Sequence, residues 1–252
     1  MAEPEKPYSI LAIGAHMDDC WLGMGGTALK AVRKGHKVTM VTAISNYRYL
    51  PYLAGRSAEL KPALEKFHAE RGIQTISLNH DYMRLHNDPA LVHEITQIVN
   101  DVKADVVFIH AEDECNFDHT ALGAASRTAA IHGGCFLETE ASEKFKYCGE
   151  IYQYTTGWQA TDFRPDTYVE IGDVIFDLLA SCNFFDDTYA KGRGPKHLTI
   201  TDHDQNDRTL ALTGHARYKF AQSISNSMGS GYAEAFKAYT RLPIGYRRLA
   251  RL

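Results

Sequence analysis

Residues 9–14 read SILAIG and are followed at once by AHMDD over residues 15–19. The first stretch is a short apolar run, which is typical of a strand that is buried on both faces of a parallel sheet. Residues 21–33 read as a helix, and residues 37–44, KVTMVTAI, are rich in the β-branched residues that favour a strand. A buried strand, a helix and a second buried strand form the repeating unit of an α/β fold.

The same alternation continues through the first half of the chain. We expect, in order, a helix over Arg56–Arg71, a strand over Thr75–Leu78, a helix over Ala90–Val102, a strand over Asp105–Ile109 and a helix over Thr120–Ile131. The pattern predicts a Rossmann-like α/β fold, with a mostly parallel sheet covered by helices on both faces.

The second half is less regular. We expect strands over Ile151–Thr155 and Thr167–Ile171, a helix over Asp173–Ala180, a long loop or hairpin over Asp186–Arg208 and a helix over Tyr232–Tyr239. The sequence shows no internal repeat and no linker, so a single domain over residues 1–252 is the expectation.

Composition excludes several functional classes. The 252 residues carry 27 basic and 31 acidic side chains, a net charge of −4, so there is no basic field for nucleic acid or for an anionic membrane surface. No apolar run reaches the length of a membrane span, and the N-terminus lacks a signal-peptide pattern. The five cysteines form no CxxC pair, which is typical of free thiols in a reducing compartment. We therefore expect a cytoplasmic enzyme.

The first candidate site follows the first strand, where His16, Asp18 and Asp19 leave its carboxyl end. In open α/β sheets, ligands bind at this edge. A histidine and an aspartate three residues apart can converge on one cation and leave the intervening Asp18 free beside it. The alternative is that one of the two acids merely caps the helix that follows.

A second polar cluster leaves the end of the 105–109 strand and includes Asn116, Asp118 and His119. If the two loops face each other, His119 completes a set of two imidazoles and one carboxylate with His16 and Asp19. Such a set, with a position left for water, is typical of a hydrolytic zinc site, and it also suits ferrous iron.

These motifs resemble those of a known family. AHMDD resembles the AHPDD signature of the LmbE-like, or PIG-L, zinc-dependent N-deacetylases, and NFDH over residues 116–119 resembles the family's HPDH. Further matches follow in the expected order between residues 9 and 240: RSAE at 56–59 for RxxE, FRPDTYV at 163–169 for FxPDxYV, and YAEAF at 232–236 for AEAF.

The resemblance implies a role for each matching residue. His16, Asp19 and His119 would bind one zinc ion per chain, with Fe²⁺ or another divalent ion as an alternative. Asp18 would take a proton from the metal-bound water, as a carboxylate beside such a water can. In the family, the equivalent of Asp118 supports the neighbouring catalytic histidine, and the equivalent of Arg56 lies near the substrate.

The chain also departs from the family pattern. Met17 replaces a proline, and Trp21 stands where many relatives carry a glutamate, so its ring packs under the metal loop or lines the pocket. Asn116 replaces the first histidine of HPDH. An asparagine amide can donate a hydrogen bond to an oxyanion but cannot carry charge. His197 and His203, in the expected loop, are candidates for a replacement imidazole, although a loop histidine is more often solvated.

The expected function is a metal-dependent hydrolase that removes an acetyl group from an N-acetylated sugar or glycoconjugate, using water activated by Asp18. A homo-oligomer is compatible with the sequence. The alternative is a metal- or ligand-binding LmbE-like protein that has lost or changed deacetylase activity. A nucleotide-binding module is disfavoured, because two acids after the first strand would repel a pyrophosphate.

Overall fold

The computed structural model describes residues 6–145, 148–156, 162–190, 198–202, 208–227 and 231–239, together with residues 249 and 252. Its main sheet contains seven strands in the order β3-β2-β1-β4-β5-β9-β6. These strands are β1 (Ser9–Gly14), β2 (Lys37–Asn46), β3 (Ile73–Asp81), β4 (Val106–His110), β5 (Glu150–Tyr154), β6 (Thr167–Glu170) and β9 (Ala233–Ala238).

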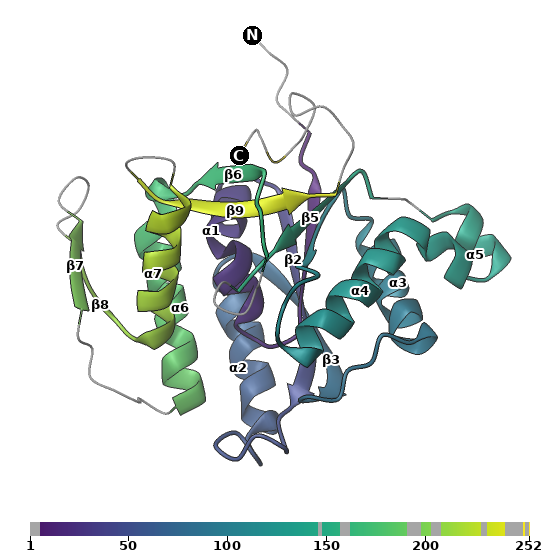
Figure 1. Cartoon of the computed structure of the whole chain (residues 1–252), viewed down its shortest axis with the longest axis horizontal. Coiled ribbons are helices and arrows are strands. Elements are labelled where there is room, and N and C mark those ends of the chain that lie inside the picture. The colour runs from purple at the N-terminus through teal and green to yellow at the C-terminus, as the bar shows by residue number, and fades with distance from the viewer. Residues whose placement is uncertain are drawn as a thin grey trace, which may run out of the picture.

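The helices connect these strands across the sheet. The longer ones are α1 (Asp19–Arg33), α2 (Ser57–Ala69), α3 (Pro89–Val102), α4 (Phe117–His132), α6 (Ile175–Ala190) and α7 (Gly214–Asn226). Helices α3 and α4 cover one face, and α1, α6 and α7 lie on the other (Figure 1). No helix among the described residues is long and apolar enough to cross a membrane.

The first five strands form the parallel part of the sheet, with β1 at its centre. Ile10 of β1 is in register with Val38 of β2 on one side and with Val106 of β4 on the other. The apolar residues of β1, β2 and β4 are buried, as the sequence predicts for strands covered on both faces. The expected α/β fold with a mostly parallel sheet is therefore confirmed.

The predicted helix over Tyr232–Tyr239 is wrong, because this segment forms β9. The strand inserts antiparallel between β5 and β6 and completes the sheet. The Ala-, Glu- and Lys-rich composition favours a helix locally, but pairing with two neighbouring strands overrides that preference. Glu234 is buried in this strand, where it accepts hydrogen bonds from the backbone of Gly26 and Thr27 and pairs with the ammonium of Lys219 at 2.7 Å.

The prediction for Asp186–Arg208 is partly wrong. The first of these residues, 186–190, continue α6, which therefore extends ten residues beyond the predicted helix end at Ala180. The hairpin alternative is correct for Leu198–Asp202 (β7) and Arg208–Leu212 (β8), which pair antiparallel. Residues 191–197 and 203–207 lie outside the described chain. Helix α7, which follows β8, has no counterpart in the sequence prediction.

Helix α1 packs unusually close to the sheet at Gly23. A Cβ atom built on this glycine would lie 2.1 Å from the ring of Tyr154 in β5, so no larger residue fits. The hydroxyl of Tyr154 in turn donates to the carbonyl oxygen of Ile13 in β1. This contact fixes the start of α1 against the ends of β1 and β5.

Candidate metal centre

The polar side chains named from the sequence meet at the carboxyl ends of β1 and β4. His16 and Asp19 come from the β1–α1 junction, and His119 comes from the first turn of α4, directly after the loop that leaves β4. Strand β1 connects to β2 on one side, while β4 lies on its other side. The site is therefore at the point where strand order reverses, which is where open α/β sheets bind ligands.

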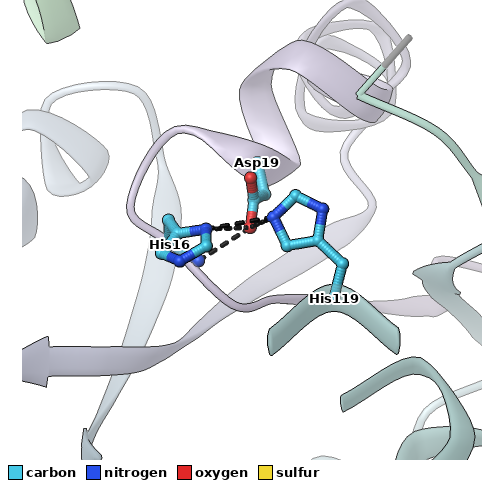
Figure 2. Close-up of side chains that lie close together, drawn as sticks. All are labelled: His16, Asp19 and His119. Atoms are coloured by element: carbon cyan, nitrogen blue, oxygen red, sulfur yellow. Dashed lines mark hydrogen bonds and ion pairs between the residues drawn. The ribbon is translucent and has the colours of Figure 1, made fainter. Parts of the chain in front are cut away.

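Three ligand atoms converge there (Figure 2). Nδ1 of His16 lies 3.0 Å from Nε2 of His119, and Oδ2 of Asp19 lies 3.4 Å from the first and 3.3 Å from the second. All three residues are buried. The structure thus brings together the three metal ligands that the sequence resemblance implies.

Two further carboxylates orient the imidazoles from behind. Asp118 lies 3.2 Å from Nε2 of His16, and Glu114 lies 3.1 Å from Nδ1 of His119. A carboxylate binds the protonated ring nitrogen, so these contacts turn Nδ1 of His16 and Nε2 of His119 toward the centre of the triangle, where each could bind a metal ion once it has lost its proton. Glu114 was not singled out from the sequence.

Asp118 contacts both the triangle and the residue at position 116. Its carboxylate lies against His16 and accepts hydrogen bonds from the backbone N–H groups of Met83 and Leu85, while its own backbone N–H donates to Oδ1 of Asn116. Burial alone would raise the pKa of this carboxyl group, but its hydrogen bonds to His16 and to the two backbone groups lower it.

The charge balance at the triangle favours a cation. Burial alone would lower the pKa values of both histidines, yet Asp19 raises that of His16 to about 9 and that of His119 to about 10. Burial alone would likewise raise the pKa of Asp19, but His119, His16 and His110 hold it well below its usual range. The negative charge of the buried Asp19 carboxylate thus stabilises positive charge at the centre of the triangle.

The spacing fits a tetrahedral metal ion. Bonds of about 2.0–2.1 Å place neighbouring ligand atoms of a tetrahedral zinc site about 3.3 Å apart. The three separations of 3.0, 3.4 and 3.3 Å match this value. His110 lies directly against the triangle: its Nε2 is 3.2 Å from Oδ2 of Asp19 and accepts a hydrogen bond from the backbone N–H of Ala15, and its ring stacks on His119.

Asp18 is not a helix cap. It occupies the residue before α1, but its side chain makes no capping hydrogen bond. Instead Oδ1 accepts a hydrogen bond from the hydroxyl of Tyr189, and Oδ2 lies 3.0 Å from Nε2 of His215. Asp19 also leaves the helix uncapped and accepts from the backbone N–H of His16. The capping alternative is therefore wrong for both acids.

Asn116 is the cap of the other helix. Its Oδ1 accepts hydrogen bonds from the backbone N–H groups of Asp118 and His119 at the start of α4. This contact orients the side chain, so the amide oxygen is engaged with the helix while the residue lines the same pocket as Asp18.

Arg56, expected to contact substrate, does not line this pocket within the described part of the chain. Its guanidinium donates to the backbone carbonyl oxygens of Thr188 and Tyr189 at the end of α6 and pairs with Glu59. Arg56 thereby helps to hold Tyr189, which reaches Asp18.

The pocket in front of the triangle has a volume of about 650 Å³. Tyrosines supply much of its wall: Tyr47, Tyr52, Tyr82, Tyr189 and Tyr218. Trp21 does not line it. Its ring is fully buried against Phe67 and Phe185, and its indole N–H donates to Nε2 of His68, so the expectation that Trp21 lines the pocket is wrong.

His215 is the functional candidate that the sequence prediction missed. It lies in the first turn of α7 and lines the pocket, 197 residues after its partner Asp18. No local spacing links two residues so far apart, and α7 itself was not predicted. The two loop histidines named from the sequence as candidates for a replacement imidazole, His197 and His203, lie outside the described residues.

A family model matches the part of the chain that contains this site. Residues 11–130 match the family model described as GlcNAc-PI de-N-acetylase, PIG-L. The matched segment contains the triangle, both supporting carboxylates and Asp18. A search of curated protein sequences finds no match.

Solved structures share the fold along nearly the whole chain. The conserved protein TT1542 from Thermus thermophilus is 20% identical with a TM-score of 0.72, covering 96% of this chain and 99% of that one. The N,N'-diacetylchitobiose deacetylase from Pyrococcus horikoshii is 19% identical with a TM-score of 0.69, covering 93% and 86%. GalB, the 4-carboxy-2-hydroxymuconate hydratase from Pseudomonas putida, is 16% identical with a TM-score of 0.66, covering 94% and 98%.

Proposed function

Over residues 11–130 the chain belongs to the PIG-L, or LmbE-like, family, and on that premise we propose that it is a metal-dependent N-deacetylase of an N-acetylated sugar or glycoconjugate. The observation that carries the proposal is the buried triangle of His16, Asp19 and His119, with Asp18 beside it at the floor of an open pocket. Two imidazoles and one carboxylate leave room for water and a substrate oxygen, as hydrolytic metal sites require.

A divalent ion held by these three residues would polarise an amide carbonyl and lower the pKa of a water molecule. Zinc is the ion we propose, since neutral imidazole and carboxylate are its usual ligands, with Fe²⁺ as the alternative for the same set. Asp118 and Glu114 would keep the two imidazoles in the tautomers that bind a metal.

The chain's own residues then divide the work. Asp18 makes no capping bond and faces the pocket, so its carboxylate is placed to accept a proton from water. The amide NH₂ of Asn116 would donate to the developing oxyanion, because its oxygen is engaged by the start of α4.

The substrate class rests on the pocket and on one structural neighbour. The N,N'-diacetylchitobiose deacetylase shares this fold. Tyrosine rings and hydroxyls along the wall offer both apolar faces and hydrogen-bonding groups, which suit a sugar ring. The hydratase with the same fold shows that the scaffold alone does not choose the reaction, so the assignment depends on the triangle and Asp18.

Amine release from a panel of N-acetylated sugars tests the proposal. We expect the wild type with bound zinc to release free amine and acetate. Asp18→Asn should keep the metal and lose about 10²–10⁴-fold in rate, because the amide fills the same space but cannot accept a proton. Asp19→Asn should instead lose the metal. A wild type that binds zinc and hydrolyses none of the acetamides would support the alternative of a protein that has lost or changed deacetylase activity.

A further inference from the structure

His215 is held between two carboxylates at the edge of the pocket. Its Nε2 lies 3.0 Å from Oδ2 of Asp18, and its Nδ1 lies 2.7 Å from Oδ1 of Asp186 in α6. The other oxygen of Asp186 accepts a hydrogen bond from the backbone N–H of His215 at 2.8 Å. The ring is therefore fixed at both nitrogens and at its backbone.

This arrangement defines the protonation of the ring. A carboxylate accepts but does not donate, so both ring nitrogens must carry a proton to satisfy both contacts. His215 is thus an imidazolium in this geometry. Burial alone would lower its pKa, but the hydrogen bonds to Asp18 and Asp186 raise it to about 10.

We propose that His215 is a second proton-transfer residue of this site, which protonates the departing amine while Asp18 takes the proton of the attacking water. The proposal rests on the proposed deacetylation. Without His215, Asp18 would have to protonate the leaving amine itself. His215 in α7 also provides an imidazole at a site where Asn116 replaces the histidine of the family motif.

Asp18 and His215 both return to their starting protonation states at the end of the reaction. A water proton passes to Asp18 as the water oxygen bonds to the acetyl carbon. The C–N bond then breaks, its electron pair stays on nitrogen, and that nitrogen takes the proton from Nε2 of His215. The amine leaves together with acetic acid, which carries the second water proton and gives it up to solvent, and Asp18 returns its proton to Nε2 across the 3.0 Å contact. Asp186 keeps the imidazolium in place and is a positioning residue.

The groups around His215 are consistent with this role. Asp18 faces it from the β1–α1 junction, Asp186 and Tyr189 face it from α6, and Tyr218 lines the pocket on its own helix. Two of these four described neighbours are acids and none is a lysine or arginine. The imidazolium therefore has two negative charges beside it, and none of these neighbours carries a positive charge that would destabilise it.

The first test compares His215→Gln with the wild type in the amine-release assay. Glutamine can still donate to Asp18 but cannot give up a proton at neutral pH. We expect kcat to fall about 10²–10⁴-fold with zinc content unchanged, and we expect imidazole to restore part of the rate of His215→Ala. The matched control is His80→Gln, because His80 is also paired with a carboxylate, Glu94 at 2.7 Å, but lies outside the pocket. It should leave kcat unchanged.

The pH profile separates catalysis from packing. The wild type should lose kcat at alkaline pH as His215 deprotonates. Asp186→Asn removes one of the two negative charges and should move this alkaline limb to lower pH, which a purely structural role would not do. If the wild type is active and His215→Gln is equally fast, His215 is not the acid although the deacetylase assignment stands. If the wild type hydrolyses no acetamide, the proposed function fails and this role fails with it.

Discussion

Glu114 accepts a hydrogen bond from Nδ1 of His119 across 3.1 Å, and this contact leaves Nε2 of His119 facing Asp19. Glu114 is buried and also accepts from the backbone N–H of Thr156. The metal centre therefore depends on a carboxylate that binds no metal itself, since it fixes the tautomer and the direction of a ligand.

Glu114→Gln should weaken zinc binding about 10–100-fold while the protein remains folded, because the charge that orients His119 is lost and the side-chain volume is kept. Competition with a chelator of known affinity measures the change. Glu112→Gln is the control, since Glu112 lies in the same loop but pairs with Arg127 at the surface. Equal zinc affinity in Glu114→Gln and the wild type would mean that Glu114 does not support the ligand.

Asn116→Asp separates the capping of α4 by this side chain from its proposed hydrogen bond to the oxyanion. The new carboxylate can still cap α4, where acids are favourable, but it has no N–H to donate. We therefore expect unchanged thermal stability and zinc content, with kcat lower by about 10²–10³-fold as for the loss of an oxyanion donor. Steady-state kinetics with parallel metal analysis decide this. An unchanged kcat would limit Asn116 to capping.

His68 links the fold to acid stability. Its Nε2 accepts the indole N–H of Trp21, and its ring also meets the hydroxyl of Thr75. Burial, with a smaller contribution from the charge of Arg71, lowers its pKa from 6.5 to about 3. The unfolded chain therefore binds a proton between pH 6.5 and pH 3 that the folded chain does not, so stability is lost as pH falls through this range.

When the pH is lowered from about 7 to about 5, we expect the titration of His68 to lower the free energy of unfolding by about 2 kcal/mol. Urea unfolding at both pH values measures it. In His68→Gln, which removes the titrating group, this share of the difference should be absent. The same difference in the variant and the wild type would show that other groups cause the acid sensitivity.

The sequence was most informative where local pattern and burial agree. The SILAIG run forms β1 at Ser9–Gly14, as predicted, because a strand covered on both faces must be apolar throughout. The convergence of His16, Asp19 and His119 was also predictable, since two neighbouring parallel strands release their loops at the same edge.

The failures occur where long-range contacts decide the outcome. YAEAFKAY has helical composition but becomes β9, because β5 and β6 leave a strand position between them and Lys219 compensates the buried Glu234. His215 was missed for a related reason. Its meaning depends on Asp18 and Asp186, which only the packing of α6 and α7 against the β1–α1 junction brings within hydrogen-bond distance.

The most direct test of the account is a zinc titration of metal-free protein, with amine release from an N-acetylated sugar as the readout. If His16, Asp19 and His119 hold the catalytic ion, the rate should rise in proportion to added zinc and level off at one ion per chain, and His119→Ala should show no such rise. A rate in metal-free protein equal to that of the zinc-loaded protein would contradict the account, as would the absence of amine release at any zinc concentration.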